Sequence, residues 1–184
     1  MKLARLYLLK EHLNIHDDSN EIALRQYLDA AEDYVRSYCN REFNYNNYAE
    51  VLVLPPDSGL KSVTVFPKEQ PLDTILNVEI DGEIISDYKI IDDAVVIDAT
   101  KYNPNYVIVT YKGGYYSPDD ANAPRVPSDL EQAVIYIASI MYNEKALGIG
   151  RQAVNTESGS FTINFQQIPE YIKNILDKYR ASDV

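Results

Sequence analysis

The stretch RVPSDLEQAVIYIASIMYNEK, residues 125–145, begins like a surface helix and then becomes apolar on every side. Ser128 and Glu131 have the spacing of a capping box, which predicts a helix start. From Ala133 to Tyr142 every residue except one serine is apolar or aromatic. A helix that packs only one face on its own core shows an apolar stripe and not a full wrap. The sequence therefore predicts a helix with two faces to cover.

Helical patterns also lie near both ends of the chain. The N-terminal part predicts a short helix over residues 4–13 and then a longer helix. Asp18 and Glu21 have capping-box spacing at the start of the longer helix, with Asp in place of Ser or Thr. Its apolar positions alternate in steps of four and three: Leu24, Leu28, Ala31, Val35 and Tyr38. Pro169 suits the first turn of a last helix, whose apolar face is Ile172, Ile175, Leu176 and Tyr179.

Between these helices the hydrophobic period changes from helical to strand-like. Asp81–Gly82 is a strong signal for a two-residue hairpin, because both positions of a type I′ turn need a positive φ, and Asp92–Asp93 is a weaker signal. Short strands with tight turns predict an antiparallel meander or small barrel. The predicted strands are residues 50–54, 61–66, 75–80, 88–91, 94–98 and 106–112.

The order of these patterns predicts an α+β fold. Residues 1–43 and 128–184 are expected to form a small helical bundle of about four helices. Residues 44–127 are expected to form an inserted β-rich domain. The stretch SFTINF, residues 160–165, alternates apolar and polar residues and predicts one more strand, far in sequence from the others.

Composition limits the classes of function. The net charge of the 184-residue chain is −11, which argues against a surface that grips nucleic acid, because phosphate binding needs a patch of Lys and Arg. The single cysteine allows no internal disulfide and fits a reducing compartment. No stretch approaches the roughly 20 apolar residues of a membrane span, and the N-terminus lacks the pattern of a signal peptide. We therefore expect synthesis in a cytoplasm and no membrane partner.

Residue types that carry chemistry are few and have no recognisable spacing. His12 and His16 are four residues apart, but the glutamate of a metalloprotease motif is missing, so we interpret them as surface histidines. Cys39 lies near a helix C-terminus, where the dipole disfavours a thiolate, which indicates a structural thiol. The glycines of residues 111–116 and 148–151 lack the spacing of a phosphate or dinucleotide loop. We predict no catalytic, cofactor-binding or metal site.

The sixteen tyrosines leave two interpretations open. Exposed aromatic side chains would suit the ligand surface of a binding module. Tyrosine is also enriched at protein interfaces, where it supplies contact area with a polar tip. Because the tyrosines are spread over predicted helices, strands and loops, the sequence favours roles in the core and at interfaces.

Three segments, taken in their order and spacing, resemble the head–tail connector proteins of long-tailed bacteriophages, also called adaptor or head-completion proteins. They are LLKEHLNIHDDSNEIALRQYLDAAEDYVRSYCNREF at residues 8–43, VIVTYKGGYY at 107–116 leading into VPSDLEQAVIYIASIMYNEK at 126–145, and IPEYIKNILDKYR at 168–180. The resemblance covers most of the chain. The long β insertion is found only in some members of this family, so the resemblance says least about its role.

The resemblance implies a structural virion protein without catalytic activity. In that family the subunits form a ring, commonly of twelve, between the portal and a stopper or tail-completion protein. The ring extends the DNA channel, and DNA passes without sequence-specific binding. Such a protein is made in the bacterial host cytoplasm and ends at the head–tail interface of the virion. The acidic balance of the chain would leave a channel that repels DNA weakly and lets it slide. The segment 44–127, with 13 acidic and 6 basic residues, carries most of the acid excess.

A ring would also explain the second face of the helix in residues 128–147, because each subunit in a ring presents two different patches to its neighbours. We expect Leu130, Val134, Ile137 and Met141 to face the helices of the same subunit. The strand at residues 160–165 has an edge that could pair with another subunit by strand addition. A terminal segment that grips the neighbouring ring is a family-level expectation. The candidate interface residues are Ala133, Tyr136, Ile140, Phe161, Ile163, Phe165, Tyr179 and Arg180.

Two other classes of function stay open at this point. A Tyr-rich β module that binds a carbohydrate or a protein ligand predicts a saturable ligand and a dispensable C-terminal helix. A small hydrolase built on His12 or His16 with acidic partners ranks last, because the sequence holds no motif for a nucleophile.

Overall fold

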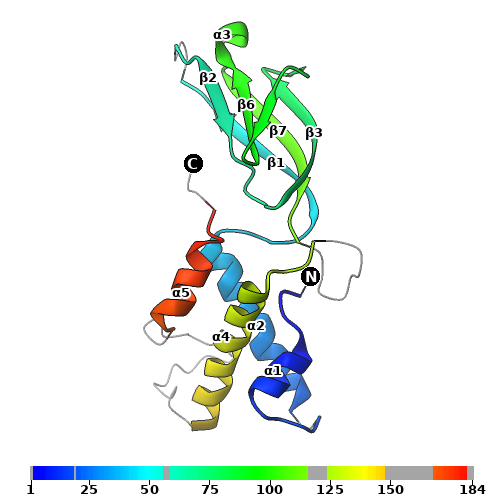
Figure 1. The fold of residues 1–184 in the computed structure, drawn as a ribbon, viewed down its shortest axis with the longest axis vertical. Coiled ribbons are helices and arrows are strands. Elements are labelled where there is room, and N and C mark those ends of the chain that lie inside the picture. Colours follow the sequence, from blue (N-terminus) through cyan, green and yellow to red (C-terminus); the bar gives the residue numbers. More distant parts are fainter. Residues whose placement is uncertain (1, 19, 56–58, 116–123, 148–167, 182–184) are drawn as a thin grey trace, which may run out of the picture. The chain divides into compact units, whose positions relative to one another are not determined.

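A computed structural model describes residues 2–18, 20–55, 59–115, 124–147 and 168–181, and these divide into two compact units (Figure 1). The helical unit comprises the described residues of Met1–Asn40 and Arg125–Arg180. The β unit comprises those of Arg41–Tyr116, Asp120–Pro124 and Ala181–Val184. Helices and antiparallel sheets are both present, so the predicted α+β class is confirmed.

The helical unit is organised around its longest helix. Its members are α1 (Leu6–His12), α2 (Glu21–Cys39), α4 (Ser128–Leu147) and α5 (Glu170–Asp177). Helix α4 packs against the other three, as Figure 1 shows for the yellow-green ribbon between α5 and the blue helices. This position gives α4 several partners within its own chain.

The predicted capping box at the start of α2 is wrong. The helix begins at Glu21 with Asn20 at the N-cap, and no side chain caps it. The Glu21 carboxylate instead accepts hydrogen bonds from Arg25, one turn further along the helix. The Asp18 carboxylate accepts a hydrogen bond from Lys10 Nζ at 2.6 Å. Both carboxylates of the predicted box are thus engaged in ion pairs and not in a cap.

Two carboxylates fasten the N-terminal segment to the helical core. Glu32 of α2 is buried and accepts hydrogen bonds from the backbone N–H of Leu3 at 2.7 Å and of Ala4 at 3.3 Å. Burial raises the pKa of Glu32 above its ordinary value, although these two bonds oppose the shift. Glu131 of α4 accepts two bonds from the guanidinium of Arg5, each 2.9 Å long. The residues before α1 are therefore part of the packed unit.

A tyrosine–carboxylate hydrogen bond joins α2 to α5. The Tyr38 hydroxyl donates to Asp177 Oδ1 at 2.8 Å. This bond, together with burial, raises the pKa of Tyr38 to about 12. Since the neutral phenol is the donor, the contact is fully present below the ordinary tyrosine pKa and is lost as the pH rises through 12.

We expect the stability advantage of the wild type over Tyr38→Phe to be constant below pH 10 and to shrink between pH 10 and 12. Denaturant unfolding followed by circular dichroism at a series of pH values measures this difference. Parallel curves for the two proteins across that window would show that the Tyr38–Asp177 bond does not stabilise the helical unit.

The β unit is built from two antiparallel sheets. One has the strand order β1-β7-β3-β4 and the other β2-β6-β5. Apolar residues of both sheets form one buried core, which includes Val65, Val95, Val107 and Tyr111. The described strands thus form two sheets around a core, and not a closed barrel. The elements are β1 (Asn46–Val53), β2 (Ser62–Val65), β3 (Leu72–Ile80), β4 (Glu83–Ile84), β5 (Lys89–Ile91), β6 (Ala94–Asp98), α3 (Ala99–Tyr102) and β7 (Tyr106–Gly113).

Both predicted hairpin turns are confirmed. Asp81 and Gly82 join β3 to β4 with φ values of 50° and 88°. Asp92 and Asp93 join β5 to β6 with φ values of 47° and 61°. Two-residue turns with positive φ at both positions match the twist of the flanking strands. The Asp81 carboxylate also accepts hydrogen bonds from the backbone N–H groups of Tyr106 and Asn105, which lower the pKa of Asp81.

A buried carboxylate holds the first residues of the β unit. Glu69 accepts hydrogen bonds from the backbone N–H of Glu42 at 2.7 Å and of Phe43 at 2.9 Å. The guanidinium of Arg41 is also buried, with its Nε 3.8 Å from the same carboxylate. The backbone N–H of Glu69 in turn donates to the hydroxyl of Tyr111 at 2.9 Å. These contacts tie the entry of the chain to the sandwich core.

Candidate subunit interface

Helix α4 is covered over most of its circumference by its own chain. The four residues expected to face the same subunit are buried: Leu130, Val134, Ile137 and Met141. Ala133 is 0% exposed as well, so in this conformation it offers no surface to a neighbour. Tyr136 and Ile140 are half-buried. They lie within a line of accessible positions at helical spacing, Gln132, Tyr136, Ile140 and Asn143.

Aromatic side chains from three helices meet at Tyr136. The ring of Tyr171 on α5 lies edge-on to the Tyr136 ring, with 5.6 Å between the ring centroids. The ring of His12 on α1 lies 6.2 Å from Tyr136, also edge-on. A hydrogen bond between the two tyrosine side chains raises the pKa of Tyr171. We call His12, Tyr136 and Tyr171 the aromatic patch.

The aromatic patch is partly open to solvent. Tyr171 is 53% exposed, His12 is exposed and Tyr136 is half-buried. Tyrosines of this kind supply rigid contact area with a polar tip, which suits a protein interface. Sequence reasoning missed His12 and Tyr171. The available signal was that Tyr171 is an aromatic residue outside the apolar face predicted for its helix.

The C-terminal candidates have different environments. Tyr179 is half-buried, and its hydroxyl donates to Asp129 Oδ1 of α4 at 2.5 Å. This bond gives Tyr179 a role inside the helical unit. Arg180 is exposed. Phe161, Ile163 and Phe165 lie outside the described residues.

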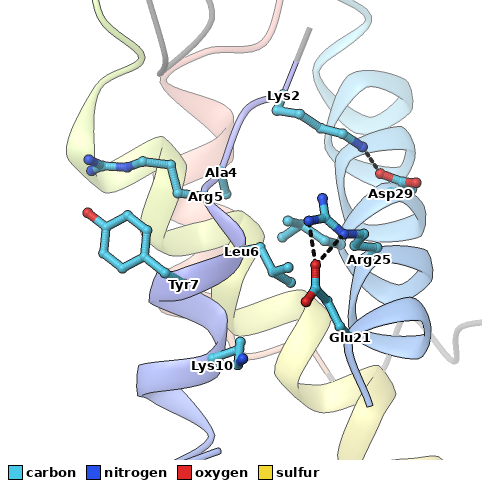
Figure 2. A pocket seen from close by; sticks show the side chains of 10 residues that line it. Lys2, Ala4, Arg5, Leu6, Tyr7, Lys10, Glu21, Arg25 and Asp29 are labelled. Carbon is cyan, nitrogen blue, oxygen red and sulfur yellow. Dashed lines mark hydrogen bonds and ion pairs between the residues drawn. The ribbon is translucent and has the colours of Figure 1, made fainter. Parts of the chain in front are cut away.

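A cavity of about 660 Å³ lies between the N-terminal segment, α1 and α2 (Figure 2). The ion pairs Lys2–Asp29 and Arg25–Glu21 cross the region drawn in Figure 2. Its other charged side chains, Arg5 and Lys10, are paired with Glu131 and Asp18. No lining residue is a histidine, cysteine or serine: they are Lys2, Ala4, Arg5, Leu6, Tyr7, Lys10, Glu21, Arg25, Leu28 and Asp29. The cavity has the character of a charged groove whose lysine, arginine and carboxylate side chains are engaged in ion pairs.

The residues considered for chemistry lie apart from this cavity. Cys39 is fully buried, with its Sγ 3.5 Å from the Leu176 carbonyl oxygen, as expected for a structural thiol. His16 is exposed and its Nε2 lies 3.0 Å from Asn14 Oδ1. Within the described ranges, no group of three His, Cys, Asp or Glu side chains could hold a metal ion. Across the same ranges, no helix is both long and apolar enough to cross a membrane.

Comparison with known proteins gives a match along nearly the whole chain. The family model described as head completion protein matches residues 6–182. This match confirms the resemblance to head–tail connector proteins. No curated protein matches the sequence.

Two solved structures match the chain. The first is a chain of the "Neck of empty GTA particle computed with C6 symmetry", with 14% identity, coverage of 99% of this chain and 91% of that chain, and a TM-score of 0.54. The second is a chain of the "Neck of native GTA particle computed with C12 symmetry", with 14% identity, coverage of 97% and 89%, and a TM-score of 0.48.

Proposed function

The chain belongs to the head completion protein family, and we propose that it is a structural neck protein that forms a homo-oligomeric ring between the portal and a stopper or tail-completion protein. The observation that carries this proposal is the family match over residues 6–182, which spans both units of the fold. The ring extends the channel through which DNA leaves the head, and the protein works by assembly and not by catalysis.

The surface of the helical unit supports this role. Each subunit of a closed ring needs two different patches that fit one another. The aromatic patch, with Ile140 one turn along α4 from Tyr136, combines exposed rings with half-buried apolar surface. We assign it to one of the two patches. Buried aromatic residues at the centre of an interface contribute a large part of the binding free energy.

The acidic balance fits a channel that does not hold DNA. The net charge of −11 gives the chain little capacity to neutralise phosphates, which is the main source of non-specific DNA affinity. Like charges along a channel keep DNA mobile during passage. The proposed ring has twelve subunits, the number that is common in this family. Its proposed site of action is the head–tail interface of the virion.

The alternative of a Tyr-rich β binding module has less support. Among the described residues of the β unit no tyrosine is exposed; Tyr111 is fully buried, and Tyr45, Tyr48, Tyr88, Tyr102, Tyr106 and Tyr115 are half-buried. A sugar-binding face of stacked aromatic rings needs accessible ring surfaces. These tyrosines mainly pack within their own unit.

Native mass spectrometry of the purified chain, alone and mixed with the portal of the same particle, tests the ring. We expect a closed assembly in at least one condition.

Tyr171→Ser should weaken each subunit contact by about 2 kcal/mol, because the variant loses a partly exposed aromatic side chain at the proposed interface. Ile22→Ser is the matched control, because Ile22 is 79% exposed on α2 and lies outside the patch.

A monomer in both conditions would overturn the ring. Equal assembly of the Tyr171→Ser and Ile22→Ser proteins would leave a ring in place but remove the aromatic patch from its interface.

A further inference from the structure

Strand β1 is an open edge of the larger sheet. It pairs with β7 over eight residues without a register shift, and no described strand lies on its other side. The Leu54 N–H donates to the Asn105 carbonyl oxygen across this pair. Backbone groups alternate in direction along a strand, so even-numbered residues of β1 bond to β7. The N–H and C=O groups of Ala49, Val51 and Val53 therefore point away from the sheet.

Among the described residues, this edge carries only one of the features that usually block strand addition, the inward-pointing Glu50. Proteins protect long edges with Lys, Pro, bulges, inward-pointing charges or covering segments. The sequence of β1, NNYAEVLV, holds neither Lys nor Pro. Its one charged residue, Glu50, accepts hydrogen bonds from the Tyr111 hydroxyl at 2.9 Å and from the Lys68 N–H at 3.1 Å.

Apolar side chains flank the open edge. Val51 is 61% exposed and Val53 is 75% exposed. Both lie opposite half-buried residues of β7, Ile108 and Tyr106, which extend the apolar surface across the sheet. Among the described residues, no hydrogen bond is made by the N–H of Ala49, Val51 or Val53. An extended segment that bonds to these groups would also cover the two valines.

The net charge of the chain favours an uncharged segment as the partner of this edge. Every copy of the chain carries −11, so contacts between copies are favoured where neither surface is charged. The outward residues of β1 are uncharged, and so is the stretch SFTINF of residues 160–165, which alternates apolar and polar residues. The twenty residues 148–167 separate the end of α4 from Ile168. A chain segment of this length that leads away from the helical unit and back to it can reach roughly 30 Å, because half of its residues span that distance at about 3.3 Å each.

We propose that the β1 edge of one subunit receives residues 160–165 of a neighbouring subunit as an added strand. The inference rests on the proposed ring and names one of its contacts. The added backbone pairs with Ala49, Val51 and Val53, and one apolar face of the added strand covers the valine side chains.

Cysteine cross-linking between separately made copies tests the pairing. One preparation carries Val51→Cys and the other Ile163→Cys, and the two are mixed under assembly conditions with a short bis-maleimide. The native Cys39 is fully buried and stays in both. Covalent dimers are expected in the mixture and in neither preparation alone. Thr64→Cys, on an exposed position of β2 in the other sheet, replaces Val51→Cys as the matched control and should give no dimer.

A proline at the edge provides an independent test. The N–H of Val51 points away from β7, so Val51→Pro removes an outward donor and no bond of the existing sheet. We expect a folded protein that needs a concentration about tenfold higher to assemble, as loss of one or two hydrogen bonds predicts. Val51→Thr keeps the donor and is the control for loss of apolar surface.

The outcomes separate this inference from the proposed function. Rings with no cross-link in the mixture, or with normal assembly of Val51→Pro, would overturn strand addition and leave the ring standing. Dimers from Val51→Cys alone would mean pairing of two β1 edges and would also overturn it. The double variant Val51→Cys, Ile163→Cys is also diluted into excess wild type, so that its neighbours carry neither introduced cysteine. We expect no cross-link under this condition. A cross-link closed within one chain would assign the segment to its own β1 and would overturn the inference. No assembly with or without the portal would overturn the ring itself.

Discussion

The Glu69→Ala variant is expected to lose about 3–5 kcal/mol of stability in the β unit, the typical cost of removing one partner of a buried ion pair. The substitution leaves the backbone N–H groups of Glu42 and Phe43 without their acceptor. It also leaves the buried guanidinium of Arg41 without its carboxylate. Each buried group that loses its partner keeps its full desolvation cost.

Hydrogen exchange measured by mass spectrometry reports this loss separately for each unit. Peptides from β3 and β7 should exchange about a hundredfold faster or more in Glu69→Ala than in the wild type. Peptides from α2 and α4 serve as an internal reference. Glu83→Ala is the matched control, because Glu83 is exposed on β4 and its replacement should change stability by less than about 0.5 kcal/mol. Similar exchange in both variants would show that Glu69 does not hold the entry of the β unit.

The Gly114→Ala variant is expected to cost about 3 kcal/mol or more, because two penalties act at one position. Gly114 has a φ of +99°, where a residue with a Cβ is strained. A Cβ at this site would also collide with the backbone carbonyl of Asn44. The two segments cannot easily move apart to relieve this collision. They are held together by the hydrogen bond that the Tyr115 N–H donates to the Phe43 carbonyl oxygen at 2.8 Å.

Gly59→Ala is the control that separates the two penalties. Gly59 has a φ of +61°, but a Cβ there would meet no atom within 4 Å. Its replacement should cost only the conformational term of about 1 kcal/mol. Thermal unfolding of both variants measures the difference. Equal losses would mean that the crowding by Asn44 has no effect on stability.

Local signals in the sequence accounted for much of the secondary structure. The hairpin at Asp81–Gly82 was predictable because positive φ at both turn positions is a property of the residues themselves. The long apolar helix of residues 128–147 was predictable from its composition, although the Glu131 carboxylate of the expected capping box binds Arg5 instead. Strand β1 was predicted too short, since it starts at Asn46 and not at residue 50. The polar residues Asn46 and Asn47 are strand only because β7 lies beside them.

The chain's periodicities and turn residues by themselves determined the α+β class, the types of most elements and the order of segments that resembles head-completion proteins. Only the tertiary structure decided which strands share a sheet and that Glu69 becomes buried. It also decided how much of α4 is covered by the rest of its own chain. Ala133 is buried, whereas Tyr136 stays accessible beside Tyr171. The reason is physical: helix and strand periods arise from neighbours in sequence, whereas burial and pairing depend on residues far apart in the chain.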